Sequence, residues 1–298
     1  MKEIVIISGK GGTGKTSLVA SMAVLAGKAV LADCDVDAAD LHLVLEPRIK
    51  KTEDFTGGKK ASIVADKCNG CGKCLEICRF GAVVKTAGEN PAMVIDDIAC
   101  EGCGVCSYFC PEKAVDFKPA VNGQWFVSDT CYGPMVHARL GVAEENSGKL
   151  VSLVRSQAKI IAEREKLPYI IVDGPPGIGC PVIASITGAD AVLVITEPTV
   201  SGEHDLKRVA GLAGHFKIPV YLCVNKYDIN PGMSSRIEGD AGSIGIKVVG
   251  RIRYDRAVTD AQLKKLPVVV FTDGAVSKDI RMTWENLVRE LNRQKESK

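Results

Sequence analysis

An α/β fold built around a mostly parallel sheet is predicted by three features of this 298-residue sequence. Its short apolar runs are near-continuous rather than alternating, which is typical of strands buried on both faces of a sheet. Helix-length segments such as Ser147–Arg164 and Ser201–Phe216 lie between most of these runs, as they do in βαβ units. Aromatic residues make up only 5% of the chain, so Val, Ile, Leu and Ala must build the core.

Seven apolar runs are the expected strands of this sheet. The first is β-branched and leads into a glycine-rich turn, after which a helix rich in Ala and Leu is expected as far as about Ala26. In chain order the expected strands are Glu3–Ser8, Ala29–Ala32, Tyr169–Val172, Ala191–Thr196, Val220–Val224, Val248–Gly250 and Val268–Phe271.

One region departs from this pattern. From about Phe55 to Gln124 the sequence has turn signals, cysteines and short strands but no long helix. Two stretches within it, Cys68–Val83 and Cys100–Val115, repeat the same cysteine spacing. We therefore expect one larger domain, residues 1–54 and 125–298, with a small α+β domain of residues 55–124 inserted into it.

The bulk composition excludes several classes of protein. The formal net charge is only +2, and no long basic run indicates a nucleic-acid partner. The N-terminus reads as a first strand rather than a signal peptide, and no apolar run reaches the roughly 18 residues of a membrane helix. These features predict a cytoplasmic protein. Because such a compartment disfavours disulfides, the twelve cysteines indicate metal binding instead.

The glycine-rich turn fits the phosphate-binding pattern G-x-x-x-x-G-K-[ST]. It follows an expected strand and opens an expected helix, which is the context the motif requires. Backbone N–H groups of the loop and the helix N-terminus would surround the phosphates. Lys15 is expected to reach the β- and γ-phosphates, and the Thr16 hydroxyl to bind Mg²⁺. The expected nucleotide contacts here are Gly9, Lys10, Gly11, Gly12, Thr13, Gly14, Lys15, Thr16 and Ser17.

The cysteine repeat has the spacing of bacterial ferredoxins that hold two [4Fe–4S] clusters. In that pattern the fourth cysteine of each run binds the other cluster. A zinc site is the rival interpretation, but zinc takes four ligands and the eight cysteines here suit two clusters better. Arg79 stands where proline is usual after the fourth cysteine. The expected ligands are Cys68, Cys71, Cys74 and Cys110 for one cluster, and Cys100, Cys103, Cys106 and Cys78 for the other.

A second lysine in the phosphate loop, Lys10, resembles the signature lysine of the deviant Walker A ATPases, the group that includes MinD, ParA, Mrp and the nitrogenase iron protein. The resemblance implies a P-loop ATPase that hydrolyses ATP as a homodimer. In that family the lysine reaches across the dimer, so Lys10 is expected to act on the partner's phosphates. A solvated loop lysine is the alternative.

Two further segments resemble the switches of this family. Leu31–Asp37 resembles the first switch, which implies that Asp35 orients the attacking water. Ile170–Gly177 resembles the Walker B and second-switch segment, which implies that Asp173 holds a Mg²⁺-bound water and that Gly177 faces the γ-phosphate. Both aspartates would act on Mg²⁺ through water. The insertion leaves the chain soon after Asp35, so nucleotide state and cluster state are expected to be coupled.

The choice of base rests on Asn225, which begins an N-K-x-D sequence ending in Asp228. In GTPases the aspartate of such a sequence selects guanine, whereas the resemblance implies an asparagine that contacts adenine. ATP is therefore favoured over GTP, with Asn225 as the expected base contact.

Four cysteines lie outside the repeat. Cys34 and Cys223 are expected to be small buried residues, and no role is assigned to Cys131. Cys180 follows the second switch, where the nitrogenase iron protein has a cluster ligand, but packing is the favoured interpretation. At the C-terminus, Ile280–Leu291 has apolar residues at helical spacing. This segment suits docking on the sheet at least as well as the membrane-targeting helix of MinD, so membrane binding is not expected.

Three functions are compatible with these motifs. The first is an ATPase whose nucleotide state gates electron transfer or cluster handling with a redox partner. The second is a positioning or partitioning ATPase with a redox-sensing ferredoxin module and a receptor protein as its partner. The third is an iron–sulfur carrier resembling Mrp, although no C-x-x-C pair lies near the C-terminus. The sequence does not identify the partner.

Overall fold

The computed structural model describes residues 1–87, 92–141 and 147–296. The chain divides into two compact units, which are described separately. The first unit comprises Met1–Thr52, Trp125–Arg139 and Ser147–Lys298, and the second comprises Glu53–Gln124 and Leu140–Asn146.

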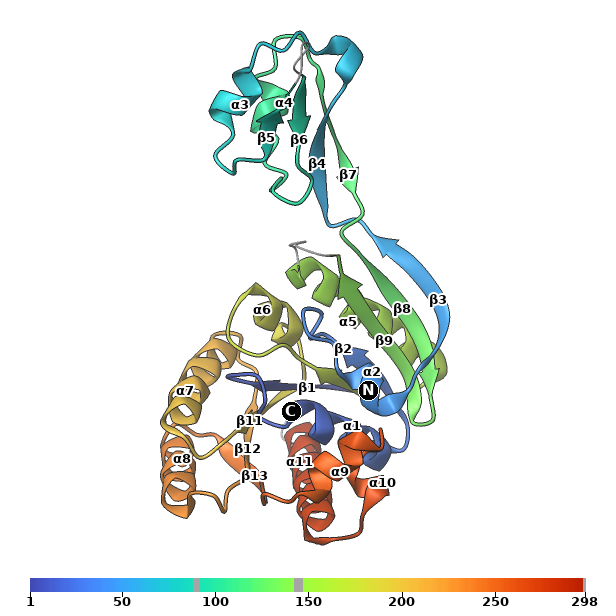
Figure 1. Cartoon of the computed structure of the whole chain (residues 1–298). Helices are drawn as coiled ribbons and strands as arrows, with labels where there is room; N and C mark the ends of the chain where they lie inside the picture. Colours follow the sequence, from blue (N-terminus) through green and yellow to red (C-terminus); the bar gives the residue numbers. More distant parts are fainter. Residues whose placement is uncertain (88–91, 142–146, 297–298) are drawn as a thin grey trace. The chain divides into compact units, whose positions relative to one another are not determined.

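A long sheet forms the centre of the first unit (Figure 1). Within the described residues it has nine strands in the order β13-β12-β11-β1-β10-β2-β9-β8-β3. Every neighbouring pair from β13 to β9 is parallel, so the carboxyl ends of these strands meet at one edge. The strands are β1 (Lys2–Ser8), β2 (Ala29–Asp33), β3 (Arg48–Phe55), β8 (Gly123–Thr130), β9 (Gly133–Leu140), β10 (Tyr169–Asp173), β11 (Ala191–Thr196), β12 (Val220–Asn225) and β13 (Lys247–Ile252).

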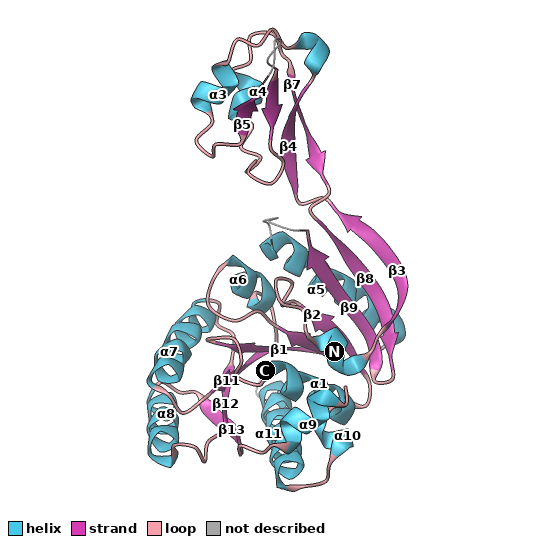
Figure 2. Cartoon of the chain, in the orientation of Figure 1, coloured by secondary structure: helices cyan, strands magenta, loops and turns pink. Residues whose placement is uncertain are grey.

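Helices cover both faces of this sheet (Figure 2). The predicted α/β class with a mostly parallel sheet is confirmed, and the helices expected near Ser147–Arg164 and Ser201–Phe216 are present as α5 and α7. The helices of this unit are α1 (Lys15–Ala26), α2 (Leu41–Leu45), α5 (Ser147–Glu165), α6 (Cys180–Ile186), α7 (Val200–His215), α8 (Pro231–Ser243), α9 (Ala257–Leu263), α10 (Val268–Phe271) and α11 (Ala275–Glu296).

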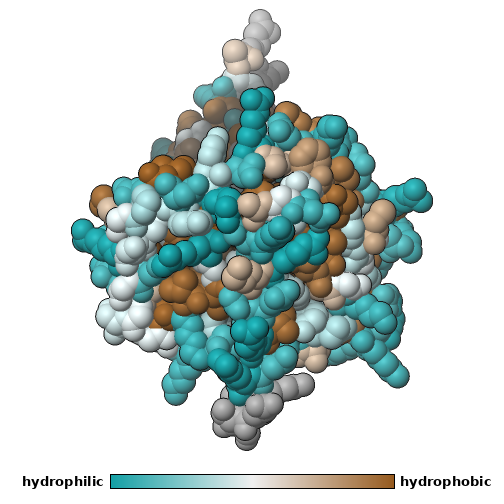
Figure 3. Space-filling view, turned by 90° about the horizontal axis from the view of Figure 1, so that it is seen from below, coloured by the Kyte–Doolittle hydropathy of each residue, from teal (hydrophilic) through white to brown (hydrophobic). Residues whose placement is uncertain are grey.

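The C-terminal helix α11 docks on the sheet. It packs against β13, and its apolar side chains Ile280, Leu287 and Leu291 are almost fully buried. Seen from below (Figure 3), the surface mixes hydrophilic and hydrophobic side chains in small areas. Of the helices in the described part of the chain, none combines the length and the apolar character needed to cross a membrane. The apolar spacing of this segment therefore serves the core.

The strand predicted at Val268–Phe271 is wrong, because this run forms the short helix α10. It follows Pro267 and packs on α1, with Val268 and Val269 buried and Val270 46% exposed. Four apolar residues suit either a strand or one helical turn, and sequence periodicity cannot separate the two over so short a run. The sheet instead extends on its other side, through β9, β8 and β3, which were not among the expected strands.

Among its described residues, the second unit contains two small antiparallel strand pairs. β4 (Gly58–Ile63) pairs with β7 (Val115–Ala120), and β5 (Val83–Lys85) pairs with β6 (Met93–Ile95). Two short helices, α3 (Lys73–Ile77) and α4 (Val105–Tyr108), contact each other. Each begins after a glycine in the left-handed region, so the repeat seen in the sequence is also a repeat of backbone structure.

Candidate nucleotide-binding site and cysteine-lined cavities

A cleft of about 730 Å³ lies at the carboxyl ends of the strands in the first unit. In parallel α/β sheets this edge is the usual place for ligands. Its lining includes most of the phosphate loop, Asp35 of the first switch and Asn225 after β12. The remaining lining residues are Ser8, Ala38, Asp40, Leu43, Val44, Pro176, Lys226, Arg253, Tyr254, Asp255, Val258, Thr259 and Gln262.

The phosphate loop owes its shape to two glycines in the left-handed region, Gly12 (φ 77°) and Gly14 (φ 84°). A side chain at Gly14 would also lie 2.6 Å from the Asn225 amide nitrogen. That amide donates a 2.7 Å hydrogen bond to the Thr13 carbonyl, which ties the end of β12 to the loop. The loop ends where α1 begins at Lys15, so the first N–H groups of α1 face the cleft.

Lys15 is buried and bound to Asp35 and Asp173, the aspartates of the two expected switches. Its ammonium donates to a carboxylate oxygen of Asp173 and lies 3.4 Å from Asp35 Oδ2. Burial alone would lower the pKa of Lys15, but the charges of Asp173 and then Asp35 raise it overall. Asp173 Oδ2 is buried with no hydrogen-bond partner in the described structure. A buried carboxylate oxygen without a partner suits a water bound to Mg²⁺.

A third carboxylate, Asp33, lies beside Asp173 across β2 and β10. Burial, and then the charge of Asp173, raises the pKa of Asp33 well above its usual value. Asp33 accepts hydrogen bonds from the N–H groups of Asp35 and of Leu41, the first residue of α2. It therefore shapes the loop that carries Asp35. Burial also raises the pKa of Asp35, although Lys15 opposes this, so the group as a whole favours a cation.

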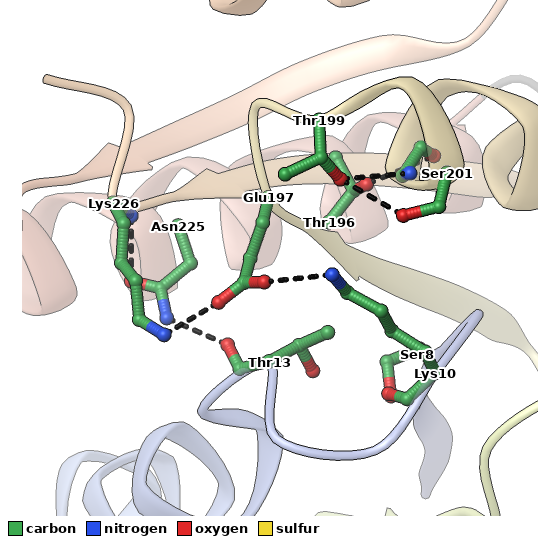
Figure 4. Close-up of polar contacts among 10 residues, drawn as sticks. Ser8, Lys10, Thr13, Thr196, Glu197, Thr199, Ser201, Asn225 and Lys226 are labelled. Atoms are coloured by element: carbon green, nitrogen blue, oxygen red, sulfur yellow. Dashed lines mark hydrogen bonds and ion pairs between the residues drawn. The ribbon is translucent and has the colours of Figure 1, made fainter. Parts of the chain in front are cut away.

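Lys10 projects from the loop toward the end of β11 (Figure 4). Its ammonium lies 3.2 Å from Glu197 Oε2, and the other carboxylate oxygen of Glu197 accepts a hydrogen bond from Lys226. Burial raises the pKa of Glu197, but bonds from Lys226 and Lys10 lower it overall. Sequence reasoning did not identify Glu197 or Lys226 as site residues, because neither belongs to a motif of phosphate binding.

The end of the cleft near Asn225 contains groups that the sequence did not indicate as lining residues. Arg253, Tyr254 and Asp255 follow β13 and line the cleft, and Tyr254 is 58% exposed. The carboxylate of Asp228 accepts a 2.7 Å hydrogen bond from the Tyr254 N–H and is not among the lining residues. The position of these residues at a strand end was the only available signal for them.

The eight cysteines of the second unit divide between two cavities. One cavity, of about 610 Å³, is lined by Cys78, Cys100, Cys103 and Cys106. The other is smaller and is lined by Cys68, Cys71, Cys74 and Cys110. Each cavity thus joins three closely spaced cysteines of one run to the fourth cysteine of the other run. Among the described residues, no group of three His, Cys, Asp or Glu side chains is arranged to hold a single metal ion.

Cys78 has the surroundings of a thiolate. Burial raises its pKa, but the backbone N–H groups of Phe80, Ala82, Val83 and Gly81 lower it overall. Backbone donors stabilise the negative charge of a thiolate and are a recognised influence on cluster potential. The chain directly after Cys78, which begins with Arg79 instead of the usual proline, supplies these donors.

The other cysteines differ in exposure. Cys34 and Cys223 are fully buried, and burial raises the pKa of Cys223 to about 12. Cys131 and Cys180 are exposed, so the packing interpretation of Cys180 does not describe its side chain.

A phosphate loop that opens a helix beside two switch carboxylates defines a P-loop nucleotide-binding protein. The chain belongs to the CobQ/CobB/MinD/ParA nucleotide binding domain family, which it matches over residues 4–268.

Three comparisons describe its relatives. The uncharacterized protein MJ0578 of Methanocaldococcus jannaschii is 35% identical over 232 residues, covering 76% of this chain and 79% of the relative. The iron-sulfur cluster carrier protein of the same organism is 22% identical over 316 residues, covering 99% of this chain and 86% of the carrier. A chain of the MinC:MinD cell division protein complex of Aquifex aeolicus has the same fold, with a TM-score of 0.58 and 21% identity over 97% of this chain and 96% of that chain.

Proposed function

We propose that this protein is a Mg-ATP-hydrolysing ATPase that dimerises with ATP, carries two [4Fe–4S] clusters, and uses its nucleotide state to gate electron transfer or partner binding. Its membership of the MinD/ParA nucleotide-binding family supports the ATPase part. The observation that carries the cluster part is the division of eight cysteines between two cavities, four to each.

The ATPase chemistry follows from groups already near the phosphate site. When ATP binds, Lys15 exchanges its bonds to Asp35 and Asp173 for bonds to the β- and γ-phosphates. The Thr16 hydroxyl would hold Mg²⁺, and Asp173 and Asp35 would hold it through water, while Asp35 would also orient the attacking water. Mg²⁺ supplies charge neutralisation at the phosphates when it is bound. Lys10 completes the partner's site in the dimer.

ATP is the preferred nucleotide in this proposal. A guanine-selecting aspartate must face the base, whereas Asp228 is held by the Tyr254 N–H and does not line the cleft. Asn225 does line it and would contact adenine. Tyr254, exposed at the same end of the cleft, offers a ring for stacking on the base.

The cluster ligands are the two cysteine sets, Cys68, Cys71, Cys74 with Cys110, and Cys100, Cys103, Cys106 with Cys78. Four irons at the corners of a cubane each need one thiolate, which spreads the four sulfurs around a cavity instead of converging them on one ion. That geometry is compatible with the absence of a single-ion site among the described residues. The clusters would supply one-electron redox chemistry.

Iron and sulfide analysis of anaerobically purified protein tests the cluster assignment, with about eight iron and eight sulfide per chain expected for two cubanes. Sedimentation of the Asp35→Ala protein with Mg-ATP tests the ATPase assignment. This variant is expected to stay dimeric after the wild type has hydrolysed its ATP and dissociated. One zinc ion per four cysteines, or a wild type that remains monomeric in ATP, would contradict the respective part.

Gating is tested by redox titration with and without a non-hydrolysable ATP analogue. The coupling between nucleotide binding and cluster reduction is reciprocal. If the nucleotide shifts the reduction potential of a one-electron couple by about 59 mV, reduction must change the nucleotide affinity about tenfold. Identical potentials and identical affinities would favour a positioning ATPase with a passive module.

An iron–sulfur carrier is the second candidate, favoured by the similarity to the carrier of M. jannaschii over 99% of this chain. A carrier must release its cluster, whereas a redox protein must keep it. Incubation of the loaded protein with an apo-ferredoxin separates the two. Cluster transfer within minutes would favour the carrier, and retention of both clusters would favour gated electron transfer.

A further inference from the structure

Three neighbouring strands bring two lysines and one glutamate together above the phosphate loop. β1 pairs with β11 through Ser8 and Ile195, and β11 pairs with β12 through Thr196 and Val224. Lys10, Glu197 and Lys226 each lie one or two residues beyond the ends of these strands. Because the strands are parallel and adjacent, the three side chains meet at the same edge, with Glu197 in the middle (Figure 4).

The glutamate gives one carboxylate oxygen to each lysine. Lys10 lies 3.2 Å from Oε2, and Lys226 binds Oε1. Glu197 is only 13% exposed, whereas Lys10 is 39% exposed. The root of Lys10 is also held, since the Ser8 hydroxyl donates a 2.8 Å hydrogen bond to the Lys10 carbonyl. Within the single chain, Lys10 is thus directed to its own Glu197.

This position conflicts with the role of Lys10 under the proposed function. A lysine that contacts the partner's phosphates must leave the carboxylate of its own subunit. When Lys10 leaves, the mostly buried carboxylate of Glu197 is not left without a counter-charge, because Lys226 still forms an ion pair with it. The ion pair between Lys10 and Glu197 is partly exposed. Its free energy therefore corresponds to a factor of about two to five in an equilibrium constant.

We propose that Glu197 is a positioning residue that holds Lys10 on its own subunit in the nucleotide-free chain and must release it when the ATP-bound dimer forms. The release of Lys10 on dimer formation rests on the proposed function, whereas its contact with Glu197 does not. Glu197 then opposes dimerisation until the partner's phosphates compete successfully for Lys10. Lys226 sets the strength of the hold, because it shares the same carboxylate.

Two variants of this group are expected to act in opposite directions. Glu197→Gln removes the charge that attracts Lys10 and frees its ammonium. Lys226→Gln leaves Lys10 as the only cation on Glu197 and strengthens the hold. A merely structural role would move both variants the same way, since each removes one side of the same Glu197–Lys226 bond.

The holding role is measured by the rate at which an N-hydroxysuccinimide ester acylates Lys10 in the nucleotide-free, cluster-loaded protein, with exposed Lys166 as the internal reference. We expect Glu197→Gln to raise the relative rate about two- to fivefold and Lys226→Gln to lower it. Glu163→Gln, at an exposed position on α5, is the matched control and is expected to leave the rate unchanged. An unchanged rate in Glu197→Gln, or equal shifts in both variants, would overturn the proposal.

The release step is measured by sedimentation with Mg²⁺ and a non-hydrolysable ATP analogue. Glu197→Gln is expected to lower the dimer dissociation constant about two- to fivefold. The same change in a Lys10→Ala background is expected to have no effect, because the group it frees is absent. A wild type that stays monomeric while the acylation rates shift as expected would overturn the proposed dimer and leave the holding role intact. An equal effect with and without Lys10 would overturn the release step.

Discussion

The nucleotide site and the cysteine-bearing unit are built in opposite ways. The nucleotide site lies at the end of a sheet whose central strands are almost fully buried, and Lys15 already pairs with Asp35 and Asp173 there. The second unit has few buried apolar side chains: Phe55, Ala61, Ala82, Val83, Met93, Ala114 and Val115 within the described residues. We therefore expect the first site to be stable without its ligand, whereas the second unit would depend on the proposed clusters for its core.

Removal of iron is the strongest test of this difference. Anaerobic chelation is expected to unfold residues 53–124 and leave the first unit folded, because only the second unit lacks an apolar core of its own. Hydrogen exchange followed by peptide mass spectrometry measures both units in one sample. The control is the same protein kept loaded. Retained protection in the second unit after complete iron loss would break the comparison.

Lys15→Ala is expected to lower ATP affinity by at least about 100-fold, or roughly 2.7 kcal/mol, because two charge-assisted contacts to the phosphates are lost. Titration of a fluorescent ATP analogue measures this. Lys28→Ala, at an exposed position just past the end of α1, is the matched control. Normal affinity in the Lys15 variant would remove the phosphate loop from the site.

Cys78→Ser is expected to damage one cluster and spare the other, reducing iron from about eight to about four or five per chain. The affected cluster is the one bound by Cys100, Cys103 and Cys106, which line the same cavity as Cys78. Electron paramagnetic resonance of the reduced protein identifies the surviving cluster, with Cys131→Ser as the control. Loss confined to the cluster of Cys68, Cys71 and Cys74 would show that the ligand pairing is wrong.

The smallest expected effect concerns His137, on β9 of the first unit. Burial lowers its pKa to about 4, and its ring shares a 2.9 Å hydrogen bond with the Ser128 hydroxyl. A depressed pKa contributes stability above the ordinary value near 6.5, and this stability is lost as the pH falls toward about 4. We expect the free energy of unfolding, measured with denaturant between these pH values, to fall more steeply with decreasing pH in the wild type than in His137→Gln. Equal slopes would contradict the assignment.

Motifs that are local in the chain could be predicted from the sequence alone. The phosphate loop Gly9–Thr16 and the cysteine repeat could be recognised because their residues follow one another at fixed spacings within short stretches of the chain. Short apolar runs likewise predicted most of the sheet, and apolar residues at helical spacing favoured the docking of α11. The Val268–Phe271 run was wrongly predicted as a strand because it is too short for its period to be read.

Contacts between distant strand ends were decided only by the tertiary structure. The order β12-β11-β1 places Lys226, Glu197 and Lys10 together, and no local pattern encodes that order. The same holds for Asp228, whose place in the sequence suggests a base contact but whose carboxylate binds the Tyr254 N–H instead. Sequence determines which groups are available along the chain, but the pairing of strands determines which of them meet, since the ends of parallel strands converge whatever their separation in sequence.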